Sequence, residues 1–406
     1  MLQNALPYGI FHIPSINIET VMKRPGDRYG YYQVGKDKTY SRYERMDMLH
    51  KHPSDWSWVY NDDFFSQYDW TQEPTESIDQ LYKQRAEQLR RDYDYLVLYY
   101  SGGYDSANML HAFLDNGIYP DEIAVFYSRY DTVSNQHLEL RDITWDKVEA
   151  IKKQHPQIKI RKIDYADYFF KWNTLLKEAN PTRDLIYNFG SALSLNHLMI
   201  DLSYKFINDW KQLLDSGKKL AWIHGVEKPV LRYLNEQWIF NFHDALIQVN
   251  ISPMRQQVDK GNIGTYEFFY WSPNEQSAKI IIKQCHLLKR LYDSQARKDF
   301  SKIEGANPYV EGYGQSVDTM SLPFVKAIYP RNFIDDEKFF LAKNPFHVWG
   351  NRDQWYFNSD HPGSKEHWAL YRSTFDDSKQ HWKPWYNDRN TIDSGFINSM
   401  SKNYYI

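Results

Sequence analysis

Six consecutive residues have the composition of a phosphate-binding loop: Ser101, Gly102, Gly103, Tyr104, Asp105 and Ser106. Two adjacent glycines let the backbone turn tightly and bring its N–H groups against phosphate oxygens. The hydroxyls of Ser101 and Ser106 can donate hydrogen bonds to the same oxygens. Because a bare carboxylate repels phosphate, Asp105 fits this site if it caps the next helix or binds a Mg²⁺ ion that bridges the phosphates. The alternative is a plain Gly-Gly turn that ends a buried strand.

A second charged segment runs from His224 to Pro229 and is followed by Arg232. Lys228 could offset the negative charge of a bound phosphate, and Arg232 could clamp an oxygen with two hydrogen bonds, which makes them the catalytic candidates beside Asp105. A solvated charged turn ended by proline explains the same residues equally well. His224 alone is more typical of the edge of a core than of an acid or base.

The elements around both segments alternate between strands and helices. Short apolar runs predict strands at 95–100, 122–128 and 220–224, a further strand is predicted at 158–163, and helical patterns lie between the strands at 107–116, 138–155 and 185–214. This alternation predicts an α/β fold with a parallel sheet and helices on both faces. Ligands of such sheets bind at the carboxyl ends of the strands, and residues 101–106 and 224–232 are expected there.

The strand, the SGGYDS sequence and the helix after it resemble the PP-loop ATP pyrophosphatase superfamily (adenine nucleotide alpha hydrolase-like), whose SGGxDS signature matches at every fixed position. The resemblance covers roughly residues 93–232 and implies a doubly wound, mainly parallel sheet of the HUP-like type. It also implies binding of ATP with magnesium and, in most members, adenylation of an acid, amide or base carbonyl. In the family the end of the second strand holds adenine, which here implies Ser128 and Arg129; a plain strand end is the alternative. The loop is not a Walker P-loop, because Gly-Lys-Ser/Thr is absent.

The resemblance favours an ATP-dependent ligase that forms AMP and pyrophosphate. An acceptor carbonyl or carboxylate would be adenylated, and an amine or ammonia would then displace AMP, as in asparagine synthase-like amide formation. Acceptor candidates are a nucleobase (free, in tRNA or in DNA) and a small acid. The alternatives are a phosphoadenylylsulfate reductase-like protein and a PP-loop nucleotide-binding protein without catalysis.

Cys285 is the only cysteine. One cysteine excludes a disulfide framework within the chain, and sulfur transfer through a cysteine pair and a Cys-based zinc site are excluded as well. The helical pattern around it predicts a buried thiol. The phosphoadenylylsulfate reductases need a redox cysteine, usually near the C-terminal tail, and residues 401–406 contain none, which disfavours that alternative. A glutamine-hydrolysing half also needs a catalytic cysteine, so we expect the nitrogen to come from ammonia, an amine substrate or a nitrogen-donor partner protein.

The chain has 406 residues and a formal net charge of −3, which argues against a surface built throughout for nucleic acid. Aromatic residues make up 17%; they suit base stacking but more often fill cores. We expect three regions: an aromatic-rich N-terminal extension at 1–92, a PP-loop nucleotide-binding domain at 93–240, and a mixed α+β acceptor region at 241–406. In the flanks, the patterns predict a hairpin around 35–38, a helix at 76–92, a strand at 266–271 and a helix at 275–292. No apolar run long enough for a membrane helix and no basic leader is present, so a cytoplasmic protein is expected.

Overall fold

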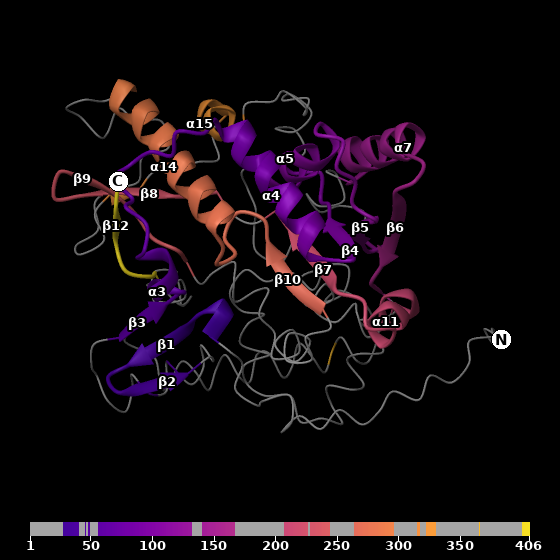
Figure 1. Cartoon of the computed structure of the whole chain (residues 1–406), viewed down its shortest axis with the longest axis horizontal. Helices are drawn as coiled ribbons and strands as arrows, with labels where there is room; N and C mark the ends of the chain where they lie inside the picture. Colours follow the sequence, from indigo (N-terminus) through magenta and orange to yellow (C-terminus); the bar gives the residue numbers. More distant parts are fainter. Residues whose placement is uncertain are drawn as a thin grey trace.

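The computed structural model describes residues 27–39, 56–131, 140–166, 207–225, 228–243, 264–295, 315–316, 322–329 and 400–406, together with positions 45, 48 and 365. The strands of these segments form three sheets, and helices pack between and against them (Figure 1). Most of the predicted helix at 185–214 falls outside the described residues. In the part that the structure describes, no helix is long and apolar enough to cross a membrane.

The central sheet is parallel and confirms the predicted α/β fold. Its five strands are β4 (Tyr95–Tyr99), β5 (Glu122–Tyr127), β6 (Lys159–Asp164), β7 (Leu220–His224) and β10 (Gly264–Phe268), in the order β10-β7-β4-β5-β6. Along the sequence the sheet therefore begins with β4, adds β5 and then β6 on one side, and continues on the other side of β4 with β7 and β10. The order in which strands are added thus reverses between β4 and β7, although these strands are parallel. Their carboxyl ends meet where Tyr99 pairs with His224.

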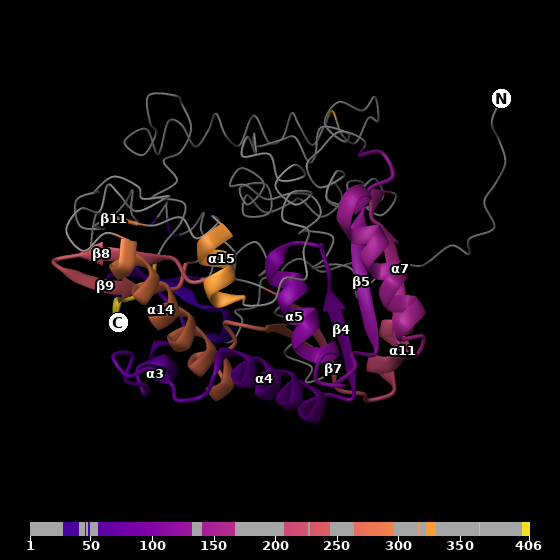
Figure 2. The same ribbon diagram turned by 90° about the horizontal axis from the view of Figure 1, so that it is seen from above.

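Helices lie on both faces of this sheet (Figure 2). Trp210 of α11 (Asn208–Asp215) packs against Trp222, which stacks on Tyr266. The next residue of β10, Glu267, binds Arg85 of α4 (Ile78–Asp92). Because successive side chains of a strand point to opposite faces, α4 and α11 cover opposite sides of the sheet.

The remaining helices extend these two layers. They are α5 (Tyr104–Leu114), which packs on α4, α7 (Trp145–Gln154), which packs on β6, and α14 (Glu275–Gln295) with α15 (Leu322–Ile328). A short helix, α3 (Asp62–Phe65), precedes α4. The predicted helix at 76–92 is confirmed: α4 begins at a capping box in which Ser77 accepts from the N–H of Gln80 and the Gln80 side chain accepts from the N–H of Ser77. The predicted strand at 266–271 is β10, so the parallel sheet takes one strand from beyond residue 240.

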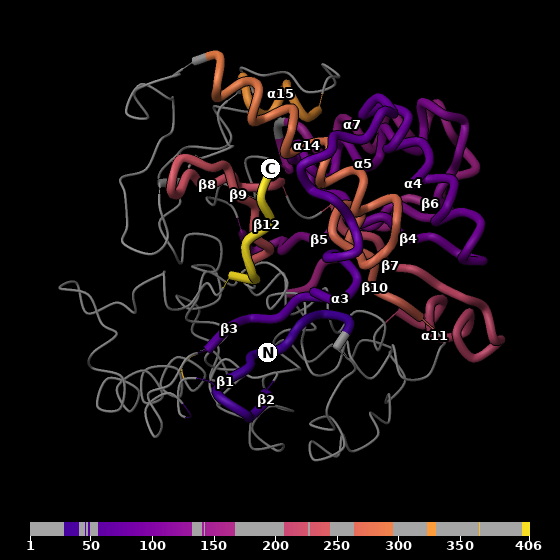
Figure 3. The backbone as a smooth tube through the Cα atoms, turned by 60° about the vertical axis from the view of Figure 1, so that its left-hand side comes forward, coloured from indigo at the N-terminus to yellow at the C-terminus, as the bar shows by residue number. Residues whose placement is uncertain are grey.

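Two antiparallel sheets flank the parallel one. The first has the order β2-β1-β3, with β1 (Tyr31–Val34) and β2 (Asp37–Thr39) forming the predicted hairpin and β3 (Trp56–Val59) beside them. The second has the order β11-β8-β9-β12, formed by β11 (Gln315–Ser316), β8 (Leu231–Leu234), β9 (Gln237–Phe240) and β12 (Tyr404–Tyr405). Figure 3 shows β12 running alongside β9.

Aromatic side chains fill the core between these sheets, as their abundance indicates. Trp70 lies with its ring centroid 4.3 Å from that of Tyr404 and 5.3 Å from that of Phe240. All three are buried, and each comes from a different part of the chain. Burying side chains of this size contributes a large share of the stabilisation, and offset or edge-on ring contacts add to it.

Candidate functional site

The loop at 101–106 connects β4 to α5 at the carboxyl end of the sheet's central strand. Gly102 has a φ of +89°, which L side chains rarely adopt, and it makes the tight turn. Gly103 is the N-cap of α5 and has an ordinary extended conformation, with φ −72°. Only the first of the two glycines is therefore required by backbone conformation.

The serine hydroxyls hold the loop in shape. Ser106 Oγ accepts from the backbone N–H of Ser101 at 3.2 Å and donates to the carbonyl oxygen of Gly103 at 3.1 Å. Ser101 Oγ lies 3.1 Å from Ser106 Oγ and accepts from the N–H of Gly103 at 3.3 Å. Ser106 is buried whereas Ser101 is exposed, so Ser101 is the serine that a bound molecule can reach. Tyr104, the first residue of α5, is buried.

Thr144 packs against the loop, and nothing in the sequence marked it as a residue of the site. It ends a π-helical turn, η2 (Leu140–Thr144), that leads into α7. Its hydroxyl donates to the carbonyl oxygen of Ser101 at 2.8 Å. A Cβ placed on Gly102 would lie 2.2 Å from that hydroxyl oxygen. The loop is thus packed against a π-helical turn, an irregularity frequently found at functional sites.

Asp105 forms an ion pair and does not cap α5. The N-cap position belongs to Gly103, so the helix begins without a side-chain cap. Lys228 Nζ donates to both carboxylate oxygens of Asp105, at 2.9 Å to Oδ1 and 2.7 Å to Oδ2. The Lys228 side chain is 4% exposed and that of Asp105 is 23% exposed. Lys228 follows β7, so the reversal of strand order brings two of the three predicted catalytic residues together.

The third, Arg232, lies in the antiparallel sheet. It is part of β8, and its guanidinium donates from Nε to Asn241 Oδ1 at 2.9 Å and from Nη2 to Asn403 Oδ1 at 3.2 Å. Arg232 is only 6% exposed. Its hydrogen bonds to described residues therefore tie β8 to the segment after β9 and to the segment before β12.

Ser128 and Arg129 lie after β5, at the same edge of the sheet as the loop. Ser128 is buried, and its hydroxyl accepts from the N–H of Tyr130 at 3.3 Å. Arg129 is exposed and pairs with Asp164, at the end of β6, at 2.8 Å. His224 is 5% exposed, with its ring 4.4 Å from that of Tyr99, as expected for a histidine at the edge of a core.

Two tyrosines that the sequence did not single out also bind Asp105. Tyr329, directly after α15, donates its hydroxyl to Asp105 Oδ1 at 2.6 Å. Tyr270 donates to the backbone carbonyl of Asp105 at 3.0 Å and accepts from Asn108 Nδ2 at 2.9 Å. Burial raises the pKa of both phenols, and the negative charge of Asp105 raises it further. Both tyrosines therefore remain neutral donors.

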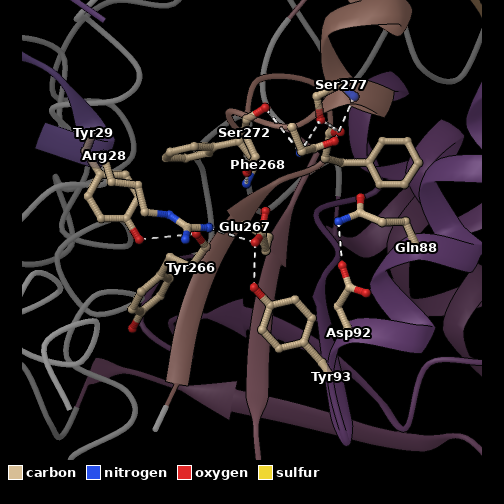
Figure 4. Close-up of polar contacts among 12 residues, drawn as sticks. Arg28, Tyr29, Gln88, Asp92, Tyr93, Tyr266, Glu267, Phe268, Ser272 and Ser277 are labelled. Atoms are coloured by element: carbon tan, nitrogen blue, oxygen red, sulfur yellow. Dashed lines mark hydrogen bonds and ion pairs between the residues drawn. The ribbon is translucent and has the colours of Figure 1, made fainter. Parts of the chain in front are cut away.

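A buried charged cluster lies on β10 (Figure 4). Glu267 accepts from Arg85 at 2.8 Å, from Arg28 at 2.7 Å and from the hydroxyl of Tyr93 at 2.6 Å. Burial alone would raise the pKa of Glu267, but the two guanidinium groups lower it to about 2. The cluster ties β10 to α4 and to the N-terminal segment, and none of these bonds involves the loop.

The thiol of Cys285 is not accessible to a substrate. Cys285 is fully buried in α14, and burial raises the pKa of its thiol. The prediction of a buried cysteine is confirmed. Among the described residues, no group of three or more His, Cys, Asp or Glu side chains could hold a metal ion.

Comparisons of the chain with protein-family models, with curated proteins and with solved structures found no match.

Proposed function

We propose that this protein is an ATP-dependent ligase of the PP-loop type, which adenylates an acceptor carbonyl or carboxylate and releases pyrophosphate. An amine or ammonia then displaces AMP from the acceptor. The observation that carries the proposal is the position of the SGGYDS loop. It lies at the carboxyl end of β4, beside the reversal between β4 and β7, with Lys228 bound to Asp105. Open α/β sheets bind ligands at this kind of reversal.

The local chemistry fits a triphosphate. The positive φ of Gly102 turns the chain directly before α5, whose first turn has no side-chain cap. An uncapped helix N-terminus supplies N–H donors and a partial positive charge to phosphate oxygens. Ser101 is exposed at this turn, and Asp105 of the same loop holds the ammonium group of Lys228. Cleavage at the α-phosphate places negative charge on the leaving pyrophosphate, which a fixed cation stabilises.

The donor set also fits magnesium. Mg²⁺ in nucleotide sites is held by one or two carboxylates, the phosphates and several waters. Asp105 offers one carboxylate, partly exposed, beside the expected position of the phosphates. When bound, the ion would offset the negative charge of the phosphates. The role of this chain would be to hold Asp105 where it can reach the ion and Lys228 where it can reach a phosphate.

Ser128 and Arg129 are proposed to line the adenosine pocket, because they end the strand next to β4. The acceptor, a nucleobase or a small acid, is proposed to bind where residues beyond 240 approach the loop; Tyr270 and Tyr329 are the described examples. Use of ATP is consistent with a cytoplasmic protein. The buried Cys285 weighs against a redox function such as that of the phosphoadenylylsulfate reductases.

Two measurements test the proposal. Calorimetry with ATP and Mg²⁺ measures binding, and phosphorus NMR during incubation with candidate acceptors identifies the products. We expect AMP and pyrophosphate; ADP would show transfer of the γ-phosphate and overturn the ligase assignment. Binding without turnover for any acceptor would favour the non-catalytic alternative.

Lys228→Met supplies the mechanistic arm of the same test. We expect kcat to fall about a hundredfold while the KM for ATP changes little, because the positive charge acts mainly in the transition state. Lys283→Met is the matched control: Lys283 is also largely buried and ion-paired, with Glu73 at 2.7 Å, but it belongs to α14 and pairs away from the loop.

A further inference from the structure

We infer that Tyr329 is a positioning residue of this site: its hydroxyl holds the Asp105 carboxylate in place when Lys228 turns from Asp105 to the phosphates of ATP. The inference rests on the proposed function and adds to it a residue from the far end of the chain. Tyr329 and Asp105 are 224 positions apart in the sequence.

The two oxygens of the Asp105 carboxylate have different hydrogen-bond partners. Oδ1 accepts from both Lys228 Nζ, at 2.9 Å, and the Tyr329 hydroxyl, at 2.6 Å. Oδ2 accepts from Lys228 Nζ at 2.7 Å. If Lys228 moves to a phosphate, Oδ1 keeps its bond to Tyr329 and Oδ2 is released. Oδ2 is therefore the oxygen that becomes available to Mg²⁺.

Such an exchange of partners is expected from the charges. A triphosphate carries several negative charges and competes with one carboxylate for the same ammonium group. After the exchange, repulsion from the phosphates would turn an unrestrained aspartate side chain toward water. A charge-assisted hydrogen bond from a neutral hydroxyl opposes that rotation without removing the negative charge that a metal ion needs.

Tyr329 is itself held rigidly. It is 2% exposed, with its ring 5.8 Å from that of Tyr270 and 6.4 Å from that of Tyr82. The hydroxyl of Tyr82 donates to the carbonyl oxygen of Ile328 at 2.7 Å, which fixes the end of α15. Tyr270 meanwhile binds the backbone carbonyl of Asp105. The side chain and the main chain of Asp105 are thus each held by a different buried tyrosine.

The arrangement of the helices explains how this contact arises. α15 packs on α14, and Figure 2 shows it between α14 and α5, the helix that carries Asp105. The 101–106 loop and β7 alone therefore do not complete the surroundings of Asp105. The segment directly after α15 closes one side of them.

The experiment compares ATP binding with and without Mg²⁺ by calorimetry for the wild type, Tyr329→Phe and Tyr60→Phe. Tyr60→Phe is the matched control, because Tyr60 is also fully buried and its hydroxyl donates to the carbonyl oxygen of Trp271 at 2.7 Å, not to Asp105 or to the end of α15. We expect Tyr329→Phe to weaken Mg²⁺-dependent ATP binding about tenfold, as for one lost hydrogen bond to a charged group, and to leave metal-free ATP binding unchanged. Tyr60→Phe should leave both affinities unchanged. Thermal unfolding of each variant verifies that it is folded.

A double variant makes the test specific. In an Asp105→Asn background, Tyr329→Phe should change ATP binding no further, because the carboxylate it positions is absent. Equal Mg²⁺ dependence in Tyr329→Phe and the wild type overturns the inference while leaving the proposed function standing. A loss of the same size in Tyr60→Phe also overturns it, since the removal of any buried hydroxyl would then explain the effect. A wild type that does not bind ATP overturns the proposed function and, with it, this inference.

Discussion

Gly225 lies directly against the backbone of Asp105 at the start of α5. A Cβ placed on Gly225 would be 2.7 Å from the carbonyl oxygen of Asp105 and 2.9 Å from Cα of Ser106. Gly225 follows β7 and Asp105 follows β4 by way of the loop, so the carboxyl ends of two neighbouring strands meet here. Only glycine permits this separation, and it brings the residues after β7 to the start of α5.

Gly225→Ala should therefore displace the start of α5, because the atoms it would meet belong to the backbone and cannot rotate away. We expect a loss of about 1–3 kcal/mol in the free energy of unfolding, measured with urea, and weaker ATP binding by calorimetry. Gly117→Ala is the control. Gly117 has a φ of +68° but no heavy atom within 4 Å of its Cβ position, so it should lose about 1 kcal/mol by backbone strain alone and bind ATP normally. Undiminished ATP binding by Gly225→Ala would contradict this role of the contact.

Gly102→Ala should be the most disruptive single change in the loop. It combines a φ of +89° with a Cβ that would lie 2.2 Å from the Thr144 hydroxyl oxygen. We expect a loss of about 3 kcal/mol, and about 1 kcal/mol for Thr144→Ala, which removes the hydrogen bond to Ser101. The double variant should lose less than the sum, because Thr144→Ala relieves the steric part of the strain. Denaturant unfolding of the wild type, the two single variants and the double variant measures these losses. Strict additivity of the two single losses would show that the residues do not interact.

Asp105 and Lys228 should be coupled in stability even without ATP. Removing one member of the pair leaves the other charge poorly solvated, and Lys228, at 4% side-chain exposure, has less access to water than Asp105, at 23%. Asp105→Asn should therefore cost more than Lys228→Met, each by about 1–3 kcal/mol, and the double variant should recover part of the loss. A double-mutant cycle by urea unfolding measures the coupling. A coupling near zero would mean that the ion pair is too well hydrated to matter.

Glu267 should make the protein acid-sensitive over a defined range. Its pKa is about 2 in the folded protein against an ordinary value of 4.5, so the folded state binds the proton more weakly than the unfolded state does. The stability that Glu267 contributes is complete above about pH 4.5 and is lost as the pH falls from 4.5 to 2; it amounts to at most about 3 kcal/mol. In Glu267→Gln the deficit in unfolding free energy should be largest at pH 7 and should shrink as the pH falls through this range.

Asp209 provides the comparison for that pH series. Its pKa is also about 2, through hydrogen bonds with Lys159 and Arg161, but its side chain is 54% exposed. Water screens such a pair, so Asp209→Asn should change the pH dependence of stability much less than Glu267→Gln. Equal effects of the two variants would mean that the buried cluster on β10 adds nothing beyond a surface pair.

Cys285 should be inert in the folded protein. The thiol is fully buried, and its pKa is raised by that burial, so the reactive thiolate is scarce. A thiol-specific reagent should label it slowly in buffer and rapidly in urea. Cys285→Ala should retain ATP binding. Rapid labelling of the native protein would contradict the buried position, and loss of ATP binding in a folded Cys285→Ala variant would restore a role for sulfur.

Three strands of the parallel sheet, β4, β5 and β7, could be predicted because they are buried on both faces and appear as short apolar runs, whereas β6 is more exposed and mixes isoleucine with charged residues. Four of the five were located within one or two residues, and the fifth, β10, was recognised as a strand but not as a partner of β7. Strand pairing across a long separation depends on packing that no local pattern records. The loop was placed correctly for the same local reason: its glycines and serines follow a buried run and precede a helix.

The surroundings of the loop were less accessible to sequence reasoning. Lys228 was expected to face phosphates, and the structure pairs it with Asp105. Arg232 is close to Lys228 in sequence, but β8 begins at Leu231 and carries Arg232 to Asn241 and Asn403. Tyr329 lies after a helix of 7 residues, too short to give a recognisable period.

The central position of β4 has a consequence for the order of folding. Its pairing with β5, through Val97 and Glu122, joins segments that are near one another in sequence, whereas its pairing with β7, through Tyr95 and Leu220, must close a much longer loop. Closing a longer loop costs more chain entropy, and contacts between distant segments form more slowly. The half of the sheet built from β4, β5 and β6 should therefore assemble first, and pulsed hydrogen exchange should find amides of β5 protected before those of β7. Because Lys228 follows β7, its ion pair with Asp105 becomes complete only when the slower half docks, so the nucleotide binding proposed for this site should appear late in refolding.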